Sequence, residues 1–330
     1  MAEQRSEADA ILEAKGICLQ FATRAGTACV LNDMGLVCRS GEVMGLVGES
    51  GSGKTVLAGV LLNHIRRPGK IVSGQVLFEG QDLLKLSASE LQPIRGRQIA
   101  IIVSNARIAL NPLIGVGGQI ANIYSSHFDV SKKEAREVAL EAIKATGIND
   151  PAARYNALPH ELSGGMVKRI IIAAALVLEP KLLIADEPTS GLDVTIQAQV
   201  LDSMAELIGQ KKTVSTVLMT RDLGIIAQYC THVVVTYAGQ VVEEAPVQRF
   251  FDGPAHPYSI LLLASASLNP ERGLAVAQIG APPSKYNLPN GCLFYERCRI
   301  PGERCRFERP PLVEVEPGHL VRCWEKDGRL

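Results

Sequence analysis

A glycine-rich stretch constrains this chain more than any other feature: Gly48-Glu49-Ser50-Gly51-Ser52-Gly53-Lys54-Thr55. It follows a short apolar run, Val43 to Val47, and precedes a helix-like segment from Val56 to Ile65. Glycines that turn consecutive N–H groups inward between a strand and a helix, with Lys-Thr after the last glycine, form a P-loop. We therefore expect Lys54 to reach the outer phosphates of a nucleotide and Thr55 to bind Mg2+. A purely structural glycine-rich turn would not need Lys-Thr at its end.

Length and charge set the next limits. The 330 residues predict one large domain with an appendage or two modest domains, and 47% hydrophobic residues allow a sizeable core. With 34 basic and 34 acidic residues, the chain has no global field that would attract nucleic acid or an anionic membrane. The longest strong apolar run, Ile170 to Leu178, is shorter than a membrane span, and the polar residues 1–10 lack the apolar core of a secretory signal. We expect a cytosolic protein.

The pattern of apolar residues predicts an order of strands and helices. Apolar residues at strand-like spacing predict an antiparallel ribbon from Ile11 to Phe21 and Val30 to Val37. Phe21 lies where an aromatic ring could stack on a nucleobase, although a core position fits its periodicity equally well. Further elements are expected as follows: strands at Ile71–Phe78 and Gln98–Val103, a short helix at Asp82–Ile94, and a helix-rich, inserted lobe that includes Lys132–Thr146.

A second cluster begins at Leu162-Ser163-Gly164-Gly165-Met166, which opens an apolar helix from Val167 to Leu178. Its N–H groups and dipole would favour an anion, although an ordinary N-cap looks the same. The apolar strand that follows, Lys181 to Ala185, ends in Asp186-Glu187. Two carboxylates at the end of a buried strand suit a division of roles, with Asp186 near Mg2+ and Glu187 polarising an attacking water.

These segments together resemble an ABC-type ATPase, because the P-loop, the Ser-Gly-Gly signature segment and Leu-Leu-Ile-Ala-Asp-Glu-Pro occur in its order and spacing. Three further features are similar to the ATPase subunits of dipeptide, oligopeptide and nickel importers: the methionine in the signature, the run from Asp193 to Gln199, and His256-Pro257-Tyr258. The resemblance covers nearly the whole chain. It implies an α/β P-loop core with an antiparallel β subdomain and an inserted helical subdomain, at about residues 105–165, within a nucleotide-binding domain of residues 1–255.

The same resemblance implies how the chain would work. ATPases of this kind form head-to-tail dimers that close on two ATP molecules. Ser163, Gly164 and Gly165 would contact ATP bound to the partner subunit, and Asp193 would lie in the loop that joins the two composite sites. The helical stretch before the signature would receive the membrane subunits.

Two residues depart from the family pattern. Ser104 stands where the family usually has glutamine, and Arg221 replaces the usual switch histidine. Arginine cannot share a proton as imidazole does, although its guanidinium could pair with a γ-phosphate. We therefore expect the chain's own hydrolytic site to be weakened, while Glu187 and the binding residues remain intact.

The composition changes after residue 245. Seven prolines punctuate residues 246–289, and Ser259–Leu268 is the only clear helix, so residues 256–330 are expected to form an accessory domain of extended loops. Four cysteines crowd its end: Cys292, Cys298, Cys305 and Cys323. Their spacing is too wide for paired CxxC zinc knuckles, but four thiolates can surround one soft-metal centre. Gly291-Cys292 and Arg297-Cys298 resemble the importer tail that can hold a 4Fe-4S cluster; zinc, unligated thiols and adventitious disulfides are the alternatives.

The sequence therefore predicts the ATP-binding subunit of an importer for peptides or a related small solute, peripheral to the cytoplasmic face of the inner membrane. The expected partners are two transmembrane permeases, a second ATPase subunit and an extracytoplasmic solute-binding protein, with no nucleic acid. A soluble ABC ATPase acting on nucleic acid or ribosomes is the competing class. Such proteins commonly have two P-loops or a long coiled coil, whereas this chain has one P-loop and no sustained heptads. A third class, a nucleotide-binding regulator that never hydrolyses, is favoured only by Ser104 and Arg221.

Overall fold

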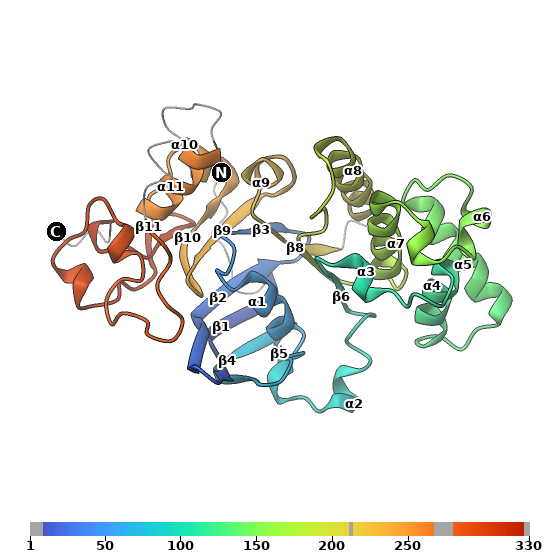
Figure 1. Cartoon of the computed structure of the whole chain (residues 1–330), viewed down its shortest axis with the longest axis horizontal. Helices are drawn as coiled ribbons and strands as arrows, with labels where there is room; N and C mark the ends of the chain where they lie inside the picture. Colours follow the sequence, from blue (N-terminus) through green and yellow to red (C-terminus); the bar gives the residue numbers. More distant parts are fainter. Residues whose placement is uncertain (1–8, 211–213, 267–279, 327–330) are drawn as a thin grey trace. The chain divides into compact units, whose positions relative to one another are not determined.

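A computed structural model describes residues 9–210, 214–266 and 280–326 (Figure 1). The chain divides into two compact units. The first unit combines the described residues up to Lys85 with those from Leu218 onward, and the second unit extends from Leu86 to Val217. The described residues on both sides of the boundary predicted between 255 and 256 belong to the first unit, and that boundary stays a prediction. Within the described ranges, no helix is long and apolar enough to cross a membrane.

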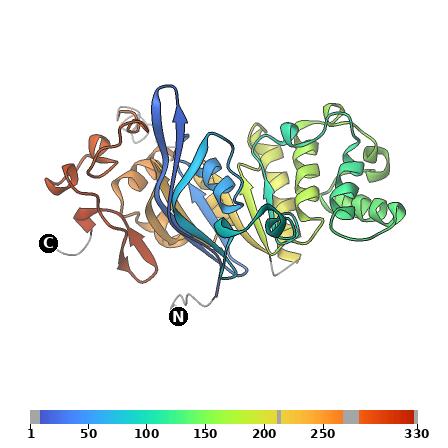
Figure 2. The same cartoon turned by 90° about the horizontal axis from the view of Figure 1, so that it is seen from below.

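The first unit begins with a long antiparallel hairpin, seen clearly in Figure 2. Its strands are β1 (Ala10–Thr23) and β2 (Gly26–Arg39), which confirms the predicted ribbon. The strand predicted at Ile71–Phe78 is β4 (Gly69–Phe78), which pairs with β1, and the short β5 (Gln81–Asp82) completes the order β2-β1-β4-β5. Alternate residues of the hairpin are buried, as the period of two along a strand requires.

A second sheet of the first unit contains the strand that leads into the P-loop. Strand β3 (Val43–Val47) pairs in parallel with β9 (His232–Tyr237), and β10 (Gln240–Pro246) returns antiparallel to β9. Two strands that the sequence analysis missed, β12 (His319–Val321) and β11 (Val313–Glu316), follow β10 in the order β11-β12-β10-β9-β3. The tail is therefore not made only of extended loops, because part of it extends this sheet.

Helices complete the first unit. The predicted helix Ser259–Leu268 is α11 as far as Ala266, and Leu268 lies outside the described residues. The helices and 3-10 turns of this unit are α1 (Lys54–Leu61), η2 (Leu83–Lys85), α9 (Leu223–Tyr229), α10 (Val247–Asp252), α11 (Pro257–Ala266), η4 (Tyr295–Arg297), η5 (Arg304–Arg306) and η6 (Trp324–Lys326).

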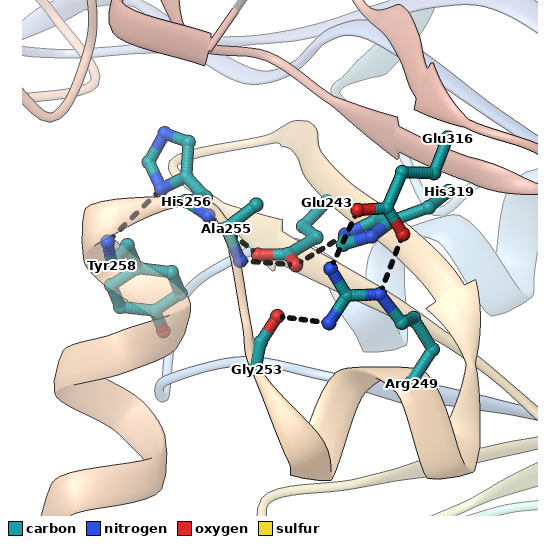
Figure 3. A network of polar contacts seen from close by, with 8 residues as sticks. All are labelled: Glu243, Arg249, Gly253, Ala255, His256, Tyr258, Glu316 and His319. Atoms are coloured by element: carbon teal, nitrogen blue, oxygen red, sulfur yellow. Dashed lines mark hydrogen bonds and ion pairs between the residues drawn. The ribbon is translucent and has the colours of Figure 1, made fainter.

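A buried carboxylate holds the tail of the first unit together (Figure 3). Glu243, in β10, is fully buried and accepts hydrogen bonds from the N–H groups of Ala255 at 2.7 Å and His256 at 2.8 Å. Nε2 of His319, in β12, lies 2.7 Å from the same carboxylate. One side chain thus links β10 with β12 and with the segment before α11, and these bonds offset the cost of burying its charge.

The second unit is mostly helical around one parallel strand pair. The strands predicted at Gln98–Val103 and Lys181–Ala185 are β6 (Ile99–Ile102) and β7 (Leu182–Asp186), and the two pair in parallel. Its helices include the predicted α5 (Lys132–Ala145) and α7 (Gly164–Leu176), together with the following: α2 (Ala88–Leu91), α3 (Ala106–Ala109), α4 (Val116–Ser125), α6 (Pro151–Tyr155), η3 (Pro159–Glu161) and α8 (Val194–Gln210). Strand β8 (Ser215–Thr220) contains the division between the units.

The prediction of one helix over Asp82–Ile94 is wrong. The segment divides into η2 and the four-residue α2, because Ser87 caps a new helix instead of continuing the first one. Its hydroxyl accepts the N–H of Glu90, and the Glu90 carboxylate accepts the N–H of Ser87, so the two form a capping box. Pro93 lies soon after and does not favour an extension of α2.

Candidate functional site

The P-loop of the first unit connects β3 to α1 and needs glycine for steric reasons. A Cβ on Gly48 would lie 2.2 Å from the carbonyl oxygen of Thr236, and one on Gly53 would lie 2.7 Å from the Leu31 side chain. Gly51 and Gly53 also adopt φ values of 82° and 106°, which other residues rarely reach. The N-cap residue of α1 is Gly53, which has no side chain that could cap the helix. The loop therefore presents backbone N–H groups to an anion such as a nucleotide phosphate, and the residues fit the predicted ATP.

Lys54 is buried at the first position of α1. Its ammonium donates to the carbonyl oxygens of Gly48 at 2.6 Å and Glu49 at 3.2 Å, so it bridges the opening of the loop. Ser52 is also buried, with its hydroxyl 3.1 Å from that of Thr236 in β9, whereas Thr55 is exposed. Lys54 and Thr55 thus lie side by side, one within the cradle and one at its surface.

Two charged residues of the tail reach the P-loop and were missed as functional candidates. Arg297, noted only as a marker beside Cys298, forms an ion pair with Glu49 at 2.9 Å across 248 positions of sequence. The ammonium of Lys285 lies 3.7 Å from the place that a Cβ on Gly51 would occupy. The backbone carbonyl oxygen of Lys285 accepts the N–H of Cys29 at 2.8 Å. No local sequence pattern could reveal contacts of such long range.

The other predicted residues of the first unit lie as follows. Phe21 is half-buried in β1, where its register partner on β4 is Gly69, and a Cβ on Gly69 would lie 2.8 Å from the Phe21 ring. Phe21 therefore packs on the sheet. Arg221 is exposed just after β8, next to Asp222, which caps α9 by accepting the N–H of Gly224 at 2.8 Å. Neither position tests the proposed roles in nucleotide binding or hydrolysis.

In the second unit, a buried lysine connects predicted site residues. Nζ of Lys168, in α7, donates to the carbonyl oxygens of Ser104 at 2.6 Å and Glu187 at 3.4 Å and to the hydroxyl of Ser190 at 3.3 Å. Burial lowers the pKa of Lys168, while the carboxylates of Asp186 and Glu187 act in the opposite direction. The sequence signal for this role was a pair of charges, Lys168-Arg169, within an otherwise apolar helix.

The carboxylate pair stands at the end of β7. Asp186 is buried as the last residue of the strand, and Glu187 follows with a φ of 43°, in the left-handed region that a glutamate seldom adopts. Such a conformation persists only where the surroundings enforce it. Here the Glu187 carbonyl is held by Lys168, so the unusual backbone and the buried lysine belong to one arrangement.

The signature segment caps α7. The Ser163 hydroxyl accepts the N–H of Met166 at 3.3 Å, as an N-cap does. A Cβ on Gly165 would lie 2.7 Å from the side chain of Ile196, so glycine lets α7 approach α8 closely. Asp193 accepts the N–H of Ile196 at 3.0 Å at the start of α8. Beside this segment, a cavity of about 460 Å³ is lined by Ser104, Asn105, Arg107, Gly164, Lys168 and Ser190, among others.

The four tail cysteines are free thiols in one region of the first unit. The N–H of Cys292 donates to the carbonyl oxygen of Cys305 at 2.8 Å. Burial raises the pKa of Cys292 and of Cys323 to about 11, so both are neutral thiols at pH 7. Among residues 9–210, 214–266 and 280–326, no three His, Cys, Asp or Glu side chains are placed to hold a metal ion. The arrangement does not fit the predicted 4Fe-4S cluster or zinc.

Of the other cysteines, Cys38 and Cys230 are buried, while Cys18 and Cys29 are half-buried. Burial raises the pKa of Cys38 far above its usual value and that of Cys230 to about 12. The two buried thiols therefore behave as apolar side chains.

The sequence and the fold of this chain are similar to those of known proteins that bind ATP. The family described as "ABC transporter" matches residues 31–190, and "Oligopeptide/dipeptide transporter, C-terminal region" matches residues 242–305. A dimeric ATP-binding cassette in a post-hydrolysis state with ADP and phosphate has a TM-score of 0.64 over 72% of this chain and 98% of its own, at 23% identity, which shows the fold alone. The cbiO1 protein of Clostridium perfringens, part of an ABC transporter complex, has a TM-score of 0.62 at 25% identity, covering 82% of this chain and 99% of its own. The chain is an ABC-type ATPase.

Full-length relatives narrow the class. The chain is 40% identical to a probable peptide ABC transporter ATP-binding protein of Sinorhizobium fredii, over 98% of both chains. It is 38% identical to the dipeptide transport ATP-binding protein DppD of Escherichia coli, over 95% of this chain and 96% of that one. It is 41% identical to the oligopeptide transport ATP-binding protein OppD of Bacillus subtilis, over 95% of this chain and 88% of that one. The chain belongs to the family of peptide ABC transporter ATP-binding proteins.

Proposed function

We propose that this chain is the ATP-binding subunit of an ABC importer for dipeptides, oligopeptides or a related small solute, and that it couples ATP binding and hydrolysis to transport. The observation that carries the proposal is the P-loop, where Lys54 bridges the opening of a glycine cradle that has no room for side chains at Gly48 and Gly53. Near full-length similarity to peptide transport proteins supports the solute class. The balanced charge of the chain does not favour the nucleic-acid alternative.

The proposed roles follow the chemistry of each residue. Lys54 and the N–H groups of the loop bind phosphates, while Thr55 and Asp186 would hold Mg2+, which neutralises phosphate charge when bound. Glu187 polarises the attacking water. Ser163, Gly164 and Gly165 contact the nucleotide of a second ATPase subunit, and Asp193 belongs to the loop between the two composite sites. Ser104 and Arg221 weaken hydrolysis by the chain's own residues.

The proposed partners follow from the same family. Two transmembrane permeases, a second ATPase subunit and an extracytoplasmic solute-binding protein would complete the transporter, with this chain peripheral to the inner membrane. Affinity purification from membranes tests this part. Co-isolation of polytopic permeases is the expected result, and recovery of ribosomes or DNA without permeases would favour the competing class.

Replacing Lys54 tests the nucleotide site. Lys54→Ala removes a cation from the phosphate cradle, so we expect ATP binding to weaken by about tenfold or more, because hydrogen bonds to charged groups are the strong ones. Lys133→Ala, which removes a highly exposed cation from α5, is the control. Equal ATP affinity of the two variants, measured by titration with a fluorescent ATP analogue, would reject the phosphate assignment.

The metal content of the tail needs its own measurement. The resemblance to importer tails and the four cysteines in one region support a 4Fe-4S cluster, whereas the placement of the thiols does not fit it. Iron and acid-labile sulfide in anaerobically purified protein decide the matter. About four of each per chain would show a cluster, stoichiometric zinc would show zinc, and neither would show unligated thiols.

A further inference from the structure

Glu49, the second residue of the P-loop, is held by a bidentate ion pair. Arg297 donates through Nη2 to Oε1 at 2.9 Å and through Nη1 to Oε2 at 3.0 Å. The Arg297 side chain is 9% exposed and that of Glu49 is 33% exposed, so the pair is largely shielded from water. Bidentate, charge-assisted pairs of this kind are strong and fix the relative orientation of the two groups.

Aromatic side chains surround this pair. The Arg297 guanidinium lies 5.5 Å from the ring centre of Tyr237 and 5.7 Å from that of Phe294, and it donates to the Tyr237 hydroxyl at 3.3 Å. Tyr258, fully buried in α11, accepts the backbone N–H of Glu49 at 2.9 Å. The rings of Tyr237 and Tyr258 are 4.7 Å apart. Glu49 is thus fixed through both its side chain and its backbone.

The fixed residue is directly linked to Lys54. The Glu49 carbonyl oxygen is one of the two acceptors of the Lys54 ammonium, so Arg297, Glu49 and Lys54 form a continuous chain of polar contacts. All three belong to the first unit. A loop that must present several N–H groups to one phosphate binds more tightly when it is already ordered, because less conformational entropy is lost on binding.

We propose that Arg297 is a positioning residue of the nucleotide site, which holds Glu49 and thereby the opening of the P-loop in the conformation that binds phosphates. The inference rests on the proposed ATP site and adds that the C-terminal region is a working part of it. Arg297 is linked to Lys54 only through Glu49 in these contacts, so it would act on the phosphates indirectly. Its contribution should therefore appear only for ligands that carry phosphates and only while Glu49 keeps its carboxylate.

The test compares Arg297→Gln with Arg249→Gln. Arg249 also forms a bidentate pair, with Glu316, but through Nε at 2.8 Å and Nη2 at 2.9 Å and at an exposed position, so it is the control for loss of an arginine–glutamate pair elsewhere in the first unit (Figure 3). Affinities for ATP, ADP and adenosine are measured on the full chain by calorimetry, together with the melting temperature. We expect Arg297→Gln to weaken ATP and ADP binding about tenfold, the size expected when the binding-competent state falls to about a tenth of the population. Adenosine affinity should stay unchanged, and Arg249→Gln should change none of the three.

A double-mutant cycle separates positioning from general stability. Glu49→Gln should reproduce the loss of Arg297→Gln, and the double variant should lose no more than either single one. Arg297→Lys, which keeps the charge but not the fork, should lie between wild type and Arg297→Gln. If Arg297→Gln does not fold, Glu49→Gln measures the same link from the other side.

Three results would overturn the proposal: unchanged ATP affinity in Arg297→Gln and Glu49→Gln, an equal loss in Arg249→Gln, or losses that add in the double variant. Lys54→Ala distinguishes this failure from failure of the site itself. If Lys54→Ala loses ATP and Arg297→Gln does not, only the positioning role is wrong. If Lys54→Ala also retains ATP, the nucleotide site is wrong.

Discussion

The contacts of Lys168 change the interpretation of Ser104, one of the two residues that depart from the family pattern. The resemblance treats Ser104 as a missing glutamine, which concerns its side chain, whereas in the structure the Ser104 carbonyl oxygen is the group engaged, by Lys168 at 2.6 Å. The three donors of the ammonium match three acceptors: two carbonyl oxygens and the Ser190 hydroxyl. A buried ammonium is costly unless it is satisfied in this way.

Lys168→Met keeps the length and apolar stem of the side chain but removes all three donors. We expect the unfolding free energy to fall by about 1–3 kcal/mol, because three hydrogen bonds from a charged donor to half-buried acceptors are lost. ATP hydrolysis should fall as well, since the Glu187 backbone loses a support. Thermal unfolding followed by circular dichroism and steady-state ATPase assays measure both effects. Lys144→Met, at an exposed position of α5, is the control, and an equal effect of the two variants would contradict the assigned contacts.

His256 is a second residue whose surroundings determine its charge. Burial lowers its pKa from 6.5 to about 4, and its Nδ1 accepts the N–H of Tyr258 at 3.0 Å, which requires the neutral ring. For Glu243, burial raises the pKa, but the hydrogen bonds from His319, Ala255 and His256 outweigh it, and the net pKa lies below its usual value. The two groups therefore respond to acid in different ranges of pH.

We expect acid to destabilise the first unit in two stages. Between pH 6.5 and about 4 the unfolded chain binds a proton at His256 that the folded chain does not. The unfolding free energy therefore decreases as the pH is lowered through this range. This term amounts to about 3 kcal/mol over the window. The contribution of Glu243 is kept above pH 4.5, the ordinary pKa of glutamate, and is lost below it. Urea unfolding followed by fluorescence of Trp324, the single tryptophan, measures the curve.

His256→Gln provides the comparison for this pH dependence. The variant has no group that titrates at this position, so the difference in unfolding free energy from wild type should shrink as the pH falls from 6.5 to 4.5. A difference that stays constant over this range would mean that His256 is not held neutral in the folded chain.

At the scale of elements, sequence patterns correctly predicted the strands and helices that depend only on neighbouring residues. The apolar run of β3, the glycines and Lys-Thr of the P-loop, and the start of α1 are adjacent in sequence, so strand, loop and helix follow from neighbouring residues. The continuous apolar run of β7 and the alternation in β1 likewise predicted their elements. In each case the spacing of apolar residues shows which side of the strand or helix is buried, without reference to its distant partners.

Elements that depend on distant partners were missed. Strands β11 and β12 have only four and three residues, and they form because β10 offers an edge for β12 to pair with. Helix α8, which begins at Val194, was not predicted, because Asp193 was assigned to a loop and the residues after it to no element. The predicted helix over Asp82–Ile94 failed for the opposite reason, since the local capping by Ser87 was not recognised.

Two glycine substitutions test whether the P-loop needs glycine at position 48 for the close approach of β3 and β9. In Gly48→Ala the added Cβ would lie 2.2 Å from the Thr236 carbonyl, so β3 and β9 must separate, and we expect ATP affinity and melting temperature to fall. In Gly209→Ala, within α8, the added Cβ meets no atom of the described residues within 4 Å. That control should gain roughly 0.5–1 kcal/mol of stability, the difference in helix propensity. A harmless Gly48→Ala would mean that the loop does not need this close approach.

At the scale of the whole molecule, the sequence could predict candidate site residues that belong to motifs, but not the distant groups that contact them. Lys54, Asp186 and Ser163 were predicted because each stands in a recognisable run. Arg297 was not, because its partner Glu49 is 248 positions away and an arginine in a loop-rich segment is most often a solvated surface residue. Contacts of this kind result from the packing of the tail, which no spacing in the sequence encodes.

The departures at Ser104 and Arg221 also have a consequence for the assembled transporter. Hydrolysis that uses this chain's Glu187 would lack the usual glutamine and histidine. Losing one preorganised contact typically costs roughly 3 kcal/mol of barrier, which slows hydrolysis on the order of a hundredfold. Hydrolysis that uses the second subunit's P-loop with this chain's Ser163, Gly164 and Gly165 has no such defect in the residues contributed here. The proposed heterodimer should therefore contain one slow and one working site.

Paired variants in the reconstituted complex test this asymmetry. Ser163→Arg places a bulky cation in the signature segment of the working site, so we expect it nearly to abolish transport-coupled ATPase activity. Glu187→Gln affects the site that we expect to be slow, and it should reduce the rate only modestly. Gly209→Ala, away from both, should leave the rate unchanged. If Glu187→Gln costs as much activity as Ser163→Arg, then Arg221 or another group restores hydrolysis at the first site, because a residue that contributes little to the total rate cannot remove most of it.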